Sequence, residues 1–156
     1  FVLLNNNFPC CHHMVCLQMT DVLTKQQRSA NMSAIKGKGN KSTELKFLKI
    51  LKEKKITGWR RNYKRVKGNP DFVFLQKKMA IFLDGCFWHG CPDCYKPPMT
   101  NPEFWELKIT NNKERDSRIS HYLHQRDWVV VRIWEHELKD IDQSFVYEKK
   151  LAPLLS

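Results

Sequence analysis

Three cysteines that lie close together in the chain, and one distant histidine, constrain this sequence more than any other feature. Cys86, Cys91 and Cys94 are separated by four and two residues, and His136 directly follows a predicted buried strand. Three thiolates and one imidazole form a closed tetrahedral zinc set, which leaves no coordination position open for catalysis. Buried free cysteines, or a disulfide between two of the three as in a secreted chain, are the alternatives. We predict a structural zinc that clamps this loop to the end of a later strand.

Length and charge narrow the class of protein. The chain has 156 residues, of which 42% are hydrophobic and 28% charged, as is typical of a single packed domain. Its 27 Lys and Arg residues outnumber 16 Asp and Glu residues, so the formal net charge is +11. This excess favours an anionic partner, and nucleic acid is the usual one. No run of 18 uncharged apolar residues occurs, so we predict no membrane span and no membrane partner.

The beginning of the chain differs from the rest in composition. Residues 1–19 contain no Asp, Glu, Lys or Arg, and all charged residues lie in 20–156. The segment lacks the basic region of a secretory signal and shows no helix or strand period. We predict that 1–18 is a disordered or non-native leader and that 19–156 is the working domain. A zinc site within the leader is an alternative, but its adjacent Cys and His residues would strain tetrahedral geometry.

The hydrophobic pattern predicts an α/β domain with a mixed sheet. A helix is expected from Glu44 to about residue 55, capped by Ser42 or Thr43, with Leu45, Leu48 and Leu51 on one face. Two apolar runs joined by a short polar turn predict a hairpin of buried strands. The other expected elements are a short strand within 59–66, a turn at 68–70, hairpin strands at 71–75 and 79–83, a loop over 84–99, one or two helices over 101–126, a strand over 128–134 and a closing helix over 137–151.

Acidic residues stand where the two hairpin strands should meet. Asp71 opens one strand and Asp84 closes the next, so their carboxylates could share a magnesium ion with phosphate oxygens and water. Phosphodiester hydrolysis needs such an ion, because charge develops on the attacking and leaving oxygens. His89 is not needed for zinc and is a candidate general acid or base. Glu44, early in its helix, could reach the same end of the sheet. Each residue alone would suit a solvated turn, so the prediction depends on the cluster.

Aromatic and basic residues predict a nucleic-acid surface. Phe87 and Trp88 lie in the cysteine loop, and Phe104 and Trp105 follow it. Exposed aromatic rings can stack on bases or wedge between base steps, and core packing is the alternative. Basic clusters suit phosphate contacts, which supply affinity but do not read sequence; a solvated face is the alternative. The two clusters are Lys25, Arg28, Lys36, Lys38 and Lys41, and Arg60, Arg61, Lys64, Arg65 and Lys67.

A series of motifs between residues 24 and 140 resembles the very-short-patch repair (Vsr) DNA mismatch endonucleases. DGCFWHGCP at 84–92 is the most specific of them, and residues 1–18 match nothing in the family. The supporting motifs are RSxNMxxI from Arg28, EL at 44–45, NPDF at 69–72, NxxFW at 101–105, KIxxNxxRD at 108–116 and WxVxRIWE at 128–135.

The resemblance implies a restriction-endonuclease-like α/β core with a mixed central sheet flanked by helices, plus a structural zinc loop. It also implies magnesium-dependent nicking of one DNA strand 5′ to the thymine of a T:G mismatch, which arises when 5-methylcytosine deaminates. By position, Asp71 resembles the essential magnesium ligand, and Leu83 would bind the ion through its main-chain carbonyl. His89 resembles the histidine that activates water. Glu44 resembles the acid that positions water or metal-bound groups, and Asp116 the acid that supports the site from the long helix.

The DNA contacts are implied in the same way. Phe87, Trp88 and Trp105 resemble the aromatic residues that intercalate beside the mismatch. Met32 lies in an N-terminal DNA-binding segment, about 24–41, that wedges into the other groove, where Arg28, Lys36 and Lys38 are further expected contacts.

Three positions are variable in the family or differ from its frequent residue. Asp84 stands where the family has Asp or His. Cys94 stands where His is frequent, and His136 where Cys is frequent. The last two changes compensate each other, so four zinc ligands remain.

The implied partner is double-stranded DNA with a T:G mismatch, bound by a monomer that repair polymerase and mismatch-repair helper proteins could assist. The implied location is the cytoplasm of a bacterium or a phage-infected cell, beside the nucleoid. One alternative is a Vsr-like nuclease, such as a homing enzyme, that nicks a specific site in matched DNA. Another is an inactive zinc-stabilised DNA-binding module. The joint presence of Asp71, His89, Glu44 and Asp116 argues against the inactive module.

Overall fold

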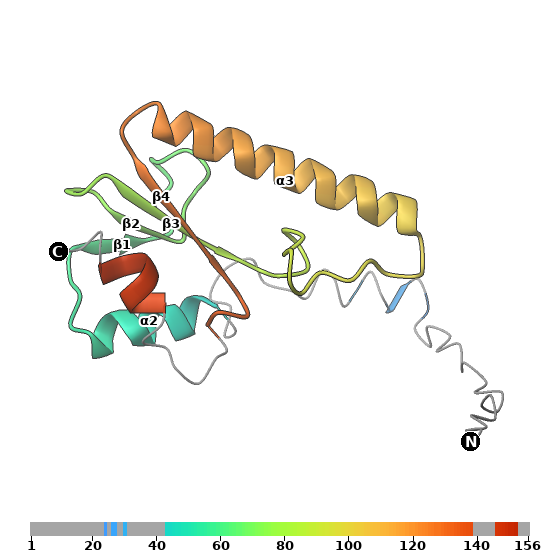
Figure 1. Ribbon diagram of the computed structural model, residues 1–156, viewed down its shortest axis with the longest axis horizontal. Coiled ribbons are helices and arrows are strands. Elements are labelled where there is room, and N and C mark those ends of the chain that lie inside the picture. Colours follow the sequence, from blue (N-terminus) through green and yellow to red (C-terminus); the bar gives the residue numbers. More distant parts are fainter. Residues whose placement is uncertain (1–23, 25, 28–29, 31–42, 139–145, 153–156) are drawn as a thin grey trace, which may run out of the picture. The chain divides into compact units, whose positions relative to one another are not determined.

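The computed structural model describes residues 24, 26–27, 30, 43–138 and 146–152 (Figure 1). The predictions for residues 1–18, Arg28, Met32, Lys36 and Lys38 lie outside this part of the chain. The chain divides into two units, residues 1–34 and 35–156. In the first unit, the Thr24 N–H donates to Gln27 Oε1 at 2.8 Å, and the Gln27 N–H donates to Thr24 Oγ1 at 3.2 Å. This reciprocal pair is the capping box of a helix N-terminus.

A four-stranded mixed sheet forms the centre of the second unit. Its strands lie side by side in chain order: β1 (Trp59–Arg61), β2 (Phe72–Phe74), β3 (Met79–Asp84) and β4 (Val129–Trp134). β2 is antiparallel to both β1 and β3, whereas β4 is parallel to β3. The mixed sheet and the hairpin are therefore confirmed. Since Phe72 pairs with Ile81, the start of β2 lies beside the end of β3, where the acidic residues were expected to meet.

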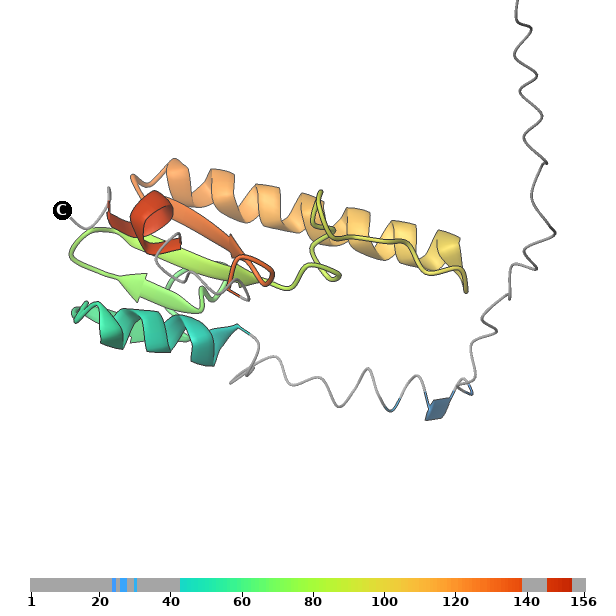
Figure 2. The same cartoon turned by 60° about the horizontal axis from the view of Figure 1, so that its bottom comes forward.

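Helices α2 (Glu44–Glu53) and α3 (Pro102–His124) lie on opposite faces of the sheet, as Figure 2 shows. Side chains alternate between the two faces of each strand, so neighbouring residues join different cores. Phe72 and Ile81 pack with α2, whereas Val73 and Ala80 pack in the cluster that includes Leu123 of α3. Each fully buried large side chain stabilises the fold by about 1.5–3 kcal/mol.

The buried face of α2 differs from the predicted one. The helix buries Phe47, Ile50 and Leu51, and Leu48 packs partly against the same core, whereas Leu45 is 41% exposed. Glu44 is itself buried, and this decides the face, because the next residue is rotated about 100° around the helix axis. The prediction that Leu45 belongs to the buried face of the helix is therefore wrong. The buried face begins one residue earlier, at Glu44.

The region after the hairpin matches the prediction in most respects. Residues 85–101 form no helix or strand, and α3 is one continuous helix with Pro102 in its first turn. No helix among the described residues combines the length and the apolar character needed to cross a membrane.

The predicted closing helix over 137–151 is wrong at its beginning. Glu137 and Leu138 lie in a turn, and in the next described stretch, 146–152, the residues are helical and include the short π-helix η1 (Tyr147–Leu151). The Glu137 carboxylate accepts hydrogen bonds from the Trp134 N–H at 2.7 Å and from Lys150 Nζ at 2.6 Å. These bonds close a turn directly after β4.

Candidate active site and metal centre

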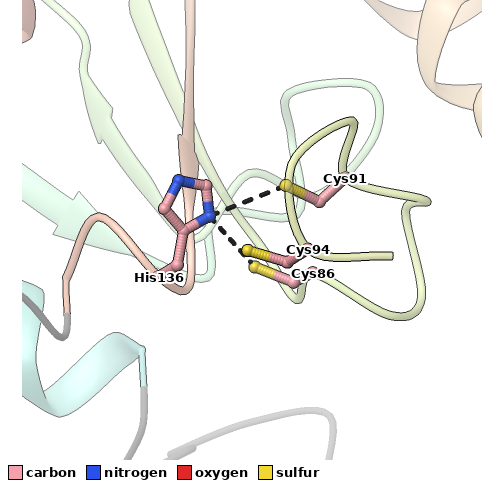
Figure 3. A group of neighbouring side chains, drawn as sticks. All are labelled: Cys86, Cys91, Cys94 and His136. Carbon is pink, nitrogen blue, oxygen red and sulfur yellow. Dashed lines mark hydrogen bonds between the residues drawn. The ribbon is translucent and has the colours of Figure 1, made fainter. Parts of the chain in front are cut away.

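The four predicted zinc ligands lie together (Figure 3). Cys86, Cys91 and Cys94 come from the loop that follows β3, and His136 from the turn that follows β4. Because β3 and β4 are parallel neighbours, their carboxyl ends meet at one edge of the sheet. The four ligand atoms lie within 4.8 Å of one another, with His136 Nδ1 3.3 Å from Cys86 Sγ and 3.6 Å from Cys91 Sγ. The juxtaposition of all four residues is therefore confirmed.

This donor set fits a tetrahedral ion such as zinc. Bonds of about 2.0–2.3 Å place tetrahedral ligands roughly 3.5–3.8 Å apart, close to the spacing found here. Burial, together with the neighbouring thiols of Cys94 and Cys91, raises the pKa of Cys86 to about 11. A divalent cation would compensate for the charge of the three thiolates. His136 Nδ1 is the ring nitrogen that faces the thiols, and Asp93 Oδ2 lies 4.0 Å from Nε2 on the other side of the ring.

The cysteine loop is pinned to α3 by close packing. Gly90 has φ +59°, and a Cβ there would lie 2.6 Å from Ile109 Cγ2. The loop can therefore approach the helix this closely only with glycine at this position. Asn112 Nδ2 also donates to the Trp88 carbonyl at 2.9 Å. As a result, His89 and its aromatic neighbours are held against α3.

His89 lies in a chain of charged side chains. Its Nδ1 is 2.5 Å from Asp116 Oδ2 and 3.5 Å from Asp84 Oδ1. Arg132 reaches Asp84 through Nε at 2.5 Å and Nη2 at 2.7 Å, and its Nη2 is 3.1 Å from Asp116 Oδ2. The structure thus brings together three residues that the sequence analysis singled out, around an arginine to which it gave no role.

The protonation states in this chain follow from the contacts. Burial by itself would raise the pKa of Asp116, but the hydrogen bond with His89 and the charge of Arg132 outweigh it and lower that pKa. Burial opposes the charge of Arg132, yet Asp84 and Asp116 raise the pKa of its guanidinium. Asp116 is therefore an anion and the acceptor for the proton on His89 Nδ1. A neutral imidazole that carries its proton on Nδ1 has Nε2 as its proton acceptor.

Asp71 meets the end of β3, as the hairpin predicted. The Leu83 N–H donates to Asp71 Oδ2 at 2.8 Å. Burial, followed by the negative charges of Glu44 and Asp84, raises the pKa of Asp71 to about 6 despite the bond from Leu83. Such a carboxylate is suited to binding a divalent cation. The positive charge of the ion would offset both the cost of burying the carboxylate charge and its repulsion by Glu44 and Asp84. Since Arg132 binds both oxygens of Asp84, Asp71 is the better placed of the two to hold magnesium.

Glu44 lies beside the start of β2, as predicted. It is 2% exposed, and its Oε2 accepts hydrogen bonds from Arg61 Nη2 at 2.7 Å and from Asn62 Nδ2 at 3.5 Å. The main-chain N–H of Asn62 donates to the Asp71 carbonyl at 2.9 Å. Asn62 therefore couples the helix acid Glu44 to the main chain of Asp71, directly before β2.

A cavity of about 490 Å³ joins Asp71 to the charged side chains around His89. Asp71, Asp84, His89, Asp116 and Arg132 line it, together with the 68–69 turn and Ile119 of α3. With about 30 Å³ for each water molecule, it has room for a phosphodiester group and its water. The carboxylate of Asp71, the imidazole of His89 and the guanidinium of Arg132 therefore line the same cavity.

The predicted intercalating residues form one aromatic cluster. The Phe87 ring centroid lies 5.3 Å from that of Trp88 and 5.1 Å from that of Trp105, and Phe104 lies 5.3 Å from Trp105. Phe104 is 56% exposed, and the other three rings are partly buried. The cluster joins the cysteine loop to the start of α3 and keeps apolar surface in contact with solvent.

Arg132 is a site residue to which the sequence patterns gave no role. It is the only charged residue in β4 (VVVRIW), which otherwise reads as a buried strand. A buried charge needs an oppositely charged partner. A lone arginine in an otherwise apolar strand could therefore have predicted an ion pair with an acidic residue.

Comparisons with known proteins find one family model and several related DNA-nicking enzymes. The model of the family described as DNA mismatch endonuclease Vsr matches residues 20–96. The type II nicking enzyme V.HpaIIP of Haemophilus parainfluenzae is 37% identical over 135 residues, which cover 85% of this chain and 94% of that protein. The DNA mismatch endonuclease Vsr of Escherichia coli (strain K12) is 37% identical over 78% of this chain and 77% of its own length.

A third relative matches over a shorter stretch. The type II nicking enzyme V.NaeI of Lentzea aerocolonigenes is 49% identical over 72 residues, which are 46% of this chain and 43% of that protein. The chain therefore spans less than half of that relative's length.

Proposed function

This chain belongs to the Vsr DNA mismatch endonuclease family, and on that premise we propose that it is a magnesium-dependent endonuclease that nicks one strand of duplex DNA at T:G mismatches. Such mismatches arise when 5-methylcytosine deaminates, so the reaction would begin very-short-patch repair. One observation carries the proposal. Asp71 and the His89–Asp116 pair line a single cavity, with Glu44 coupled to it through Asn62.

The residues divide the chemistry among them. The Asp71 carboxylate and the Leu83 main-chain carbonyl would hold magnesium, which when bound stabilises negative charge on the phosphate. His89 accepts a proton from the attacking water at Nε2. Its other ring nitrogen, Nδ1, carries a proton that is hydrogen-bonded to Asp116. Glu44 orients water or groups bound to the ion. Asp84 and Arg132 hold Asp116 and the imidazole in place.

Recognition of the mismatch is assigned to the aromatic cluster. Phe87, Trp88 and Trp105 would enter the base stack next to the mismatched pair, while Met32 would enter from the other groove. A mismatch costs less to unstack and kink than a matched pair, so insertion favours mismatched DNA. The Cys86, Cys91, Cys94 and His136 set would hold zinc and keep this loop on α3.

A nicking assay tests this function. Duplexes that differ only in carrying T:G or T:A at one position are incubated with the chain and magnesium. We expect one nick 5′ to the mismatched thymine and little cleavage of the matched duplex. Equal cleavage of both duplexes would contradict mismatch specificity, and normal nicking by Asp71→Ala would contradict the site assignment.

A second candidate function is strand nicking at a specific sequence in matched DNA. It is favoured by the names of two relatives, V.HpaIIP and V.NaeI, which are called type II nicking enzymes. The same active-site residues would act. Cleavage of a matched duplex library at one recurring sequence, with no preference for T:G, would support this function over mismatch repair.

The wider setting is proposed from the same premise. The relatives described above come from bacteria, so we propose that the chain acts as a monomer on bacterial or phage DNA in the cytoplasm, beside the nucleoid. Repair polymerase and mismatch-repair helper proteins would act with it. The restriction-endonuclease-like assignment of its mixed sheet is likewise a proposal.

A further inference from the structure

Two cations gather on one tyrosine ring beyond the candidate active site. Lys67 Nζ lies 4.0 Å from the centroid of the Tyr122 ring, and Arg126 Cζ lies 3.6 Å from it. Both cationic residues are exposed, and Tyr122 is partly buried. A cation over an aromatic ring at an exposed site gains about 0.5–1 kcal/mol. The ring therefore holds two like charges near each other at the surface.

The fold holds the main chain of Lys67 and the side chain of Arg126 beside this ring. Lys67 lies in the turn before β2, which packs so closely on α3 that a Cβ on Gly68 would be 2.5 Å from Ile119 Cγ2. Val66, directly before it, is buried in the cluster that Tyr122 packs against. Arg126 Nη1 donates to the Tyr122 carbonyl at 3.2 Å. Less side-chain entropy is therefore lost when an anion binds here than at mobile surface lysines.

Neither cation is neutralised by an acid in the part of the chain that the structure describes. Among those residues, the carboxylate nearest in sequence, Asp127, pairs with Lys78 at 3.8 Å. Two cations on one ring repel each other, and an anion that contacts both would replace that repulsion with attraction. The pair is thus suited to a phosphate group.

The position of the pair relates it to the active-site cavity. Arg115, Ile119 and Tyr122 are spaced four and three residues apart, so they share one face of α3, and Arg126 lies in the turn just after the helix ends at His124. The first two line the cavity. Along the helix axis, Tyr122 lies about 4.5 Å beyond Ile119. With about 3.4 Å per nucleotide along one DNA strand, this places the ring and its cations roughly one to two nucleotides beyond the cavity.

We propose that Lys67, Tyr122 and Arg126 form a phosphate-binding site, the Tyr122 clamp, that holds the DNA backbone about one to two nucleotides from the nicked bond. The inference rests on the proposed function, and it adds Tyr122 and Arg126 to the binding surface. The clamp anchors the duplex without reading its sequence, because phosphate contacts carry no base information.

The test measures binding of a fluorescent T:G duplex by anisotropy, without magnesium, between about 50 and about 200 mM salt. Each phosphate contact contributes about 0.9 to the slope of log K against log salt, so Lys67→Ala/Arg126→Ala should lower that slope by about 1–2. The matched control is Lys49→Ala/Lys52→Ala, which removes two exposed lysines from α2 and should leave the slope unchanged. A slope for the clamp variant that equals the control would overturn the proposal.

The ring itself is tested separately. Tyr122→Phe keeps the aromatic face and should bind DNA like the parent chain, whereas Tyr122→Leu should bind several-fold more weakly. Equal binding by a folded Tyr122→Leu variant would count against a role for the ring. A parent chain that neither binds nor nicks the duplex would contradict the proposed function. Normal nicking with an unchanged slope in the clamp variant would contradict the clamp alone.

Discussion

Arg132 donates to both carboxylate oxygens of Asp84, through Nε at 2.5 Å and Nη2 at 2.7 Å. The pair spans the two parallel strands β3 and β4, and the Asp84 side chain is 3% exposed. Arg132 thereby neutralises Asp84 and, through Nη2, also approaches Asp116. Asp71 is left as the acid whose pKa is raised. This distribution of charge leads to the following predictions.

Removing Arg132 should destabilise the fold. Arg132→Met leaves Asp84 as a buried charge without its bidentate partner, which costs about 3–5 kcal/mol of unfolding free energy. The double variant Asp84→Asn/Arg132→Met should recover most of this loss, because no unpaired charge remains. Urea denaturation measures both, with the exposed Arg118→Met as control. Equal stability of Arg132→Met and Arg118→Met would contradict the pair's importance.

The raised pKa of Asp71 predicts a specific pH dependence of stability. The carboxyl titrates near pH 6 when folded and near its ordinary 3.8 when unfolded, so the folded chain binds the extra proton between these values. Stability is therefore lost as pH rises from about 4 to about 6, and the loss is on the order of 2–3 kcal/mol. Without metal, Asp71→Asn should be more stable than the parent at pH 7.5 and equal to it near pH 4.

Magnesium provides the control for this prediction. The ion should raise the melting temperature of the parent chain at pH 7.5 and leave that of Asp71→Asn unchanged, because only the parent offers the carboxylate. Matching stabilisation of both chains by magnesium would place the ion elsewhere.

Asp116→Asn should impair nicking while leaving DNA binding intact. An amide at this position can donate its own proton to His89 Nδ1, so it no longer requires Nδ1 to carry one. His89 Nε2 would then be protonated in part of the molecules and unable to accept a proton. We expect the nicking rate to fall at least tenfold, against about 10²–10⁴-fold for His89→Ala. Single-turnover rates with anisotropy as the binding control measure this, and parent-like rates in Asp116→Asn would rule out the orienting role.

The metal cluster predicts one bound zinc per chain. His136→Ala should lose the metal and melt at a lower temperature, whereas His136→Cys should retain it, because four thiolates also complete a tetrahedral zinc set. Metal analysis of purified protein, together with melting curves, checks both outcomes. Full zinc content in His136→Ala would show that the histidine is not a ligand.

The close packing of the cysteine loop is tested at Gly90. Gly90→Ala must place a Cβ 2.6 Å from Ile109 Cγ2 at φ +59°, so it combines backbone strain with a clash. Gly58→Ala is the control, since it has φ +83° but no atom within 4 Å of its Cβ. Backbone strain alone costs about 1 kcal/mol, and the clash should add about 1–3 kcal/mol. Equal unfolding free energies for the two variants would contradict tight packing of this loop on α3.

Local sequence patterns predicted most of the helices and strands and part of the candidate site. The spacing of Cys86, Cys91 and Cys94, the hairpin that carries Asp71 and Asp84, and the long helix from Pro102 all depend on residues near one another in the chain. Turn residues and periodic hydrophobicity encode such features directly. Errors arose where burial overrides local pattern: on α2, where Glu44 is turned inward, and after β4, where Glu137 closes a turn.

The sequence by itself determined which chemical groups the chain carries and which of them lie on the same loop, strand or helix. Only the tertiary structure decided how they pair. His89 meets Asp116 across 27 residues, Arg132 meets Asp84 across 48, and Arg61 meets Glu44 across 17. These contacts exist because strand pairing and helix packing bring distant segments together, and burial then requires each charge to find a partner. Which acid keeps its charge for a metal ion, and which is neutralised by an arginine, is therefore a property of the folded chain.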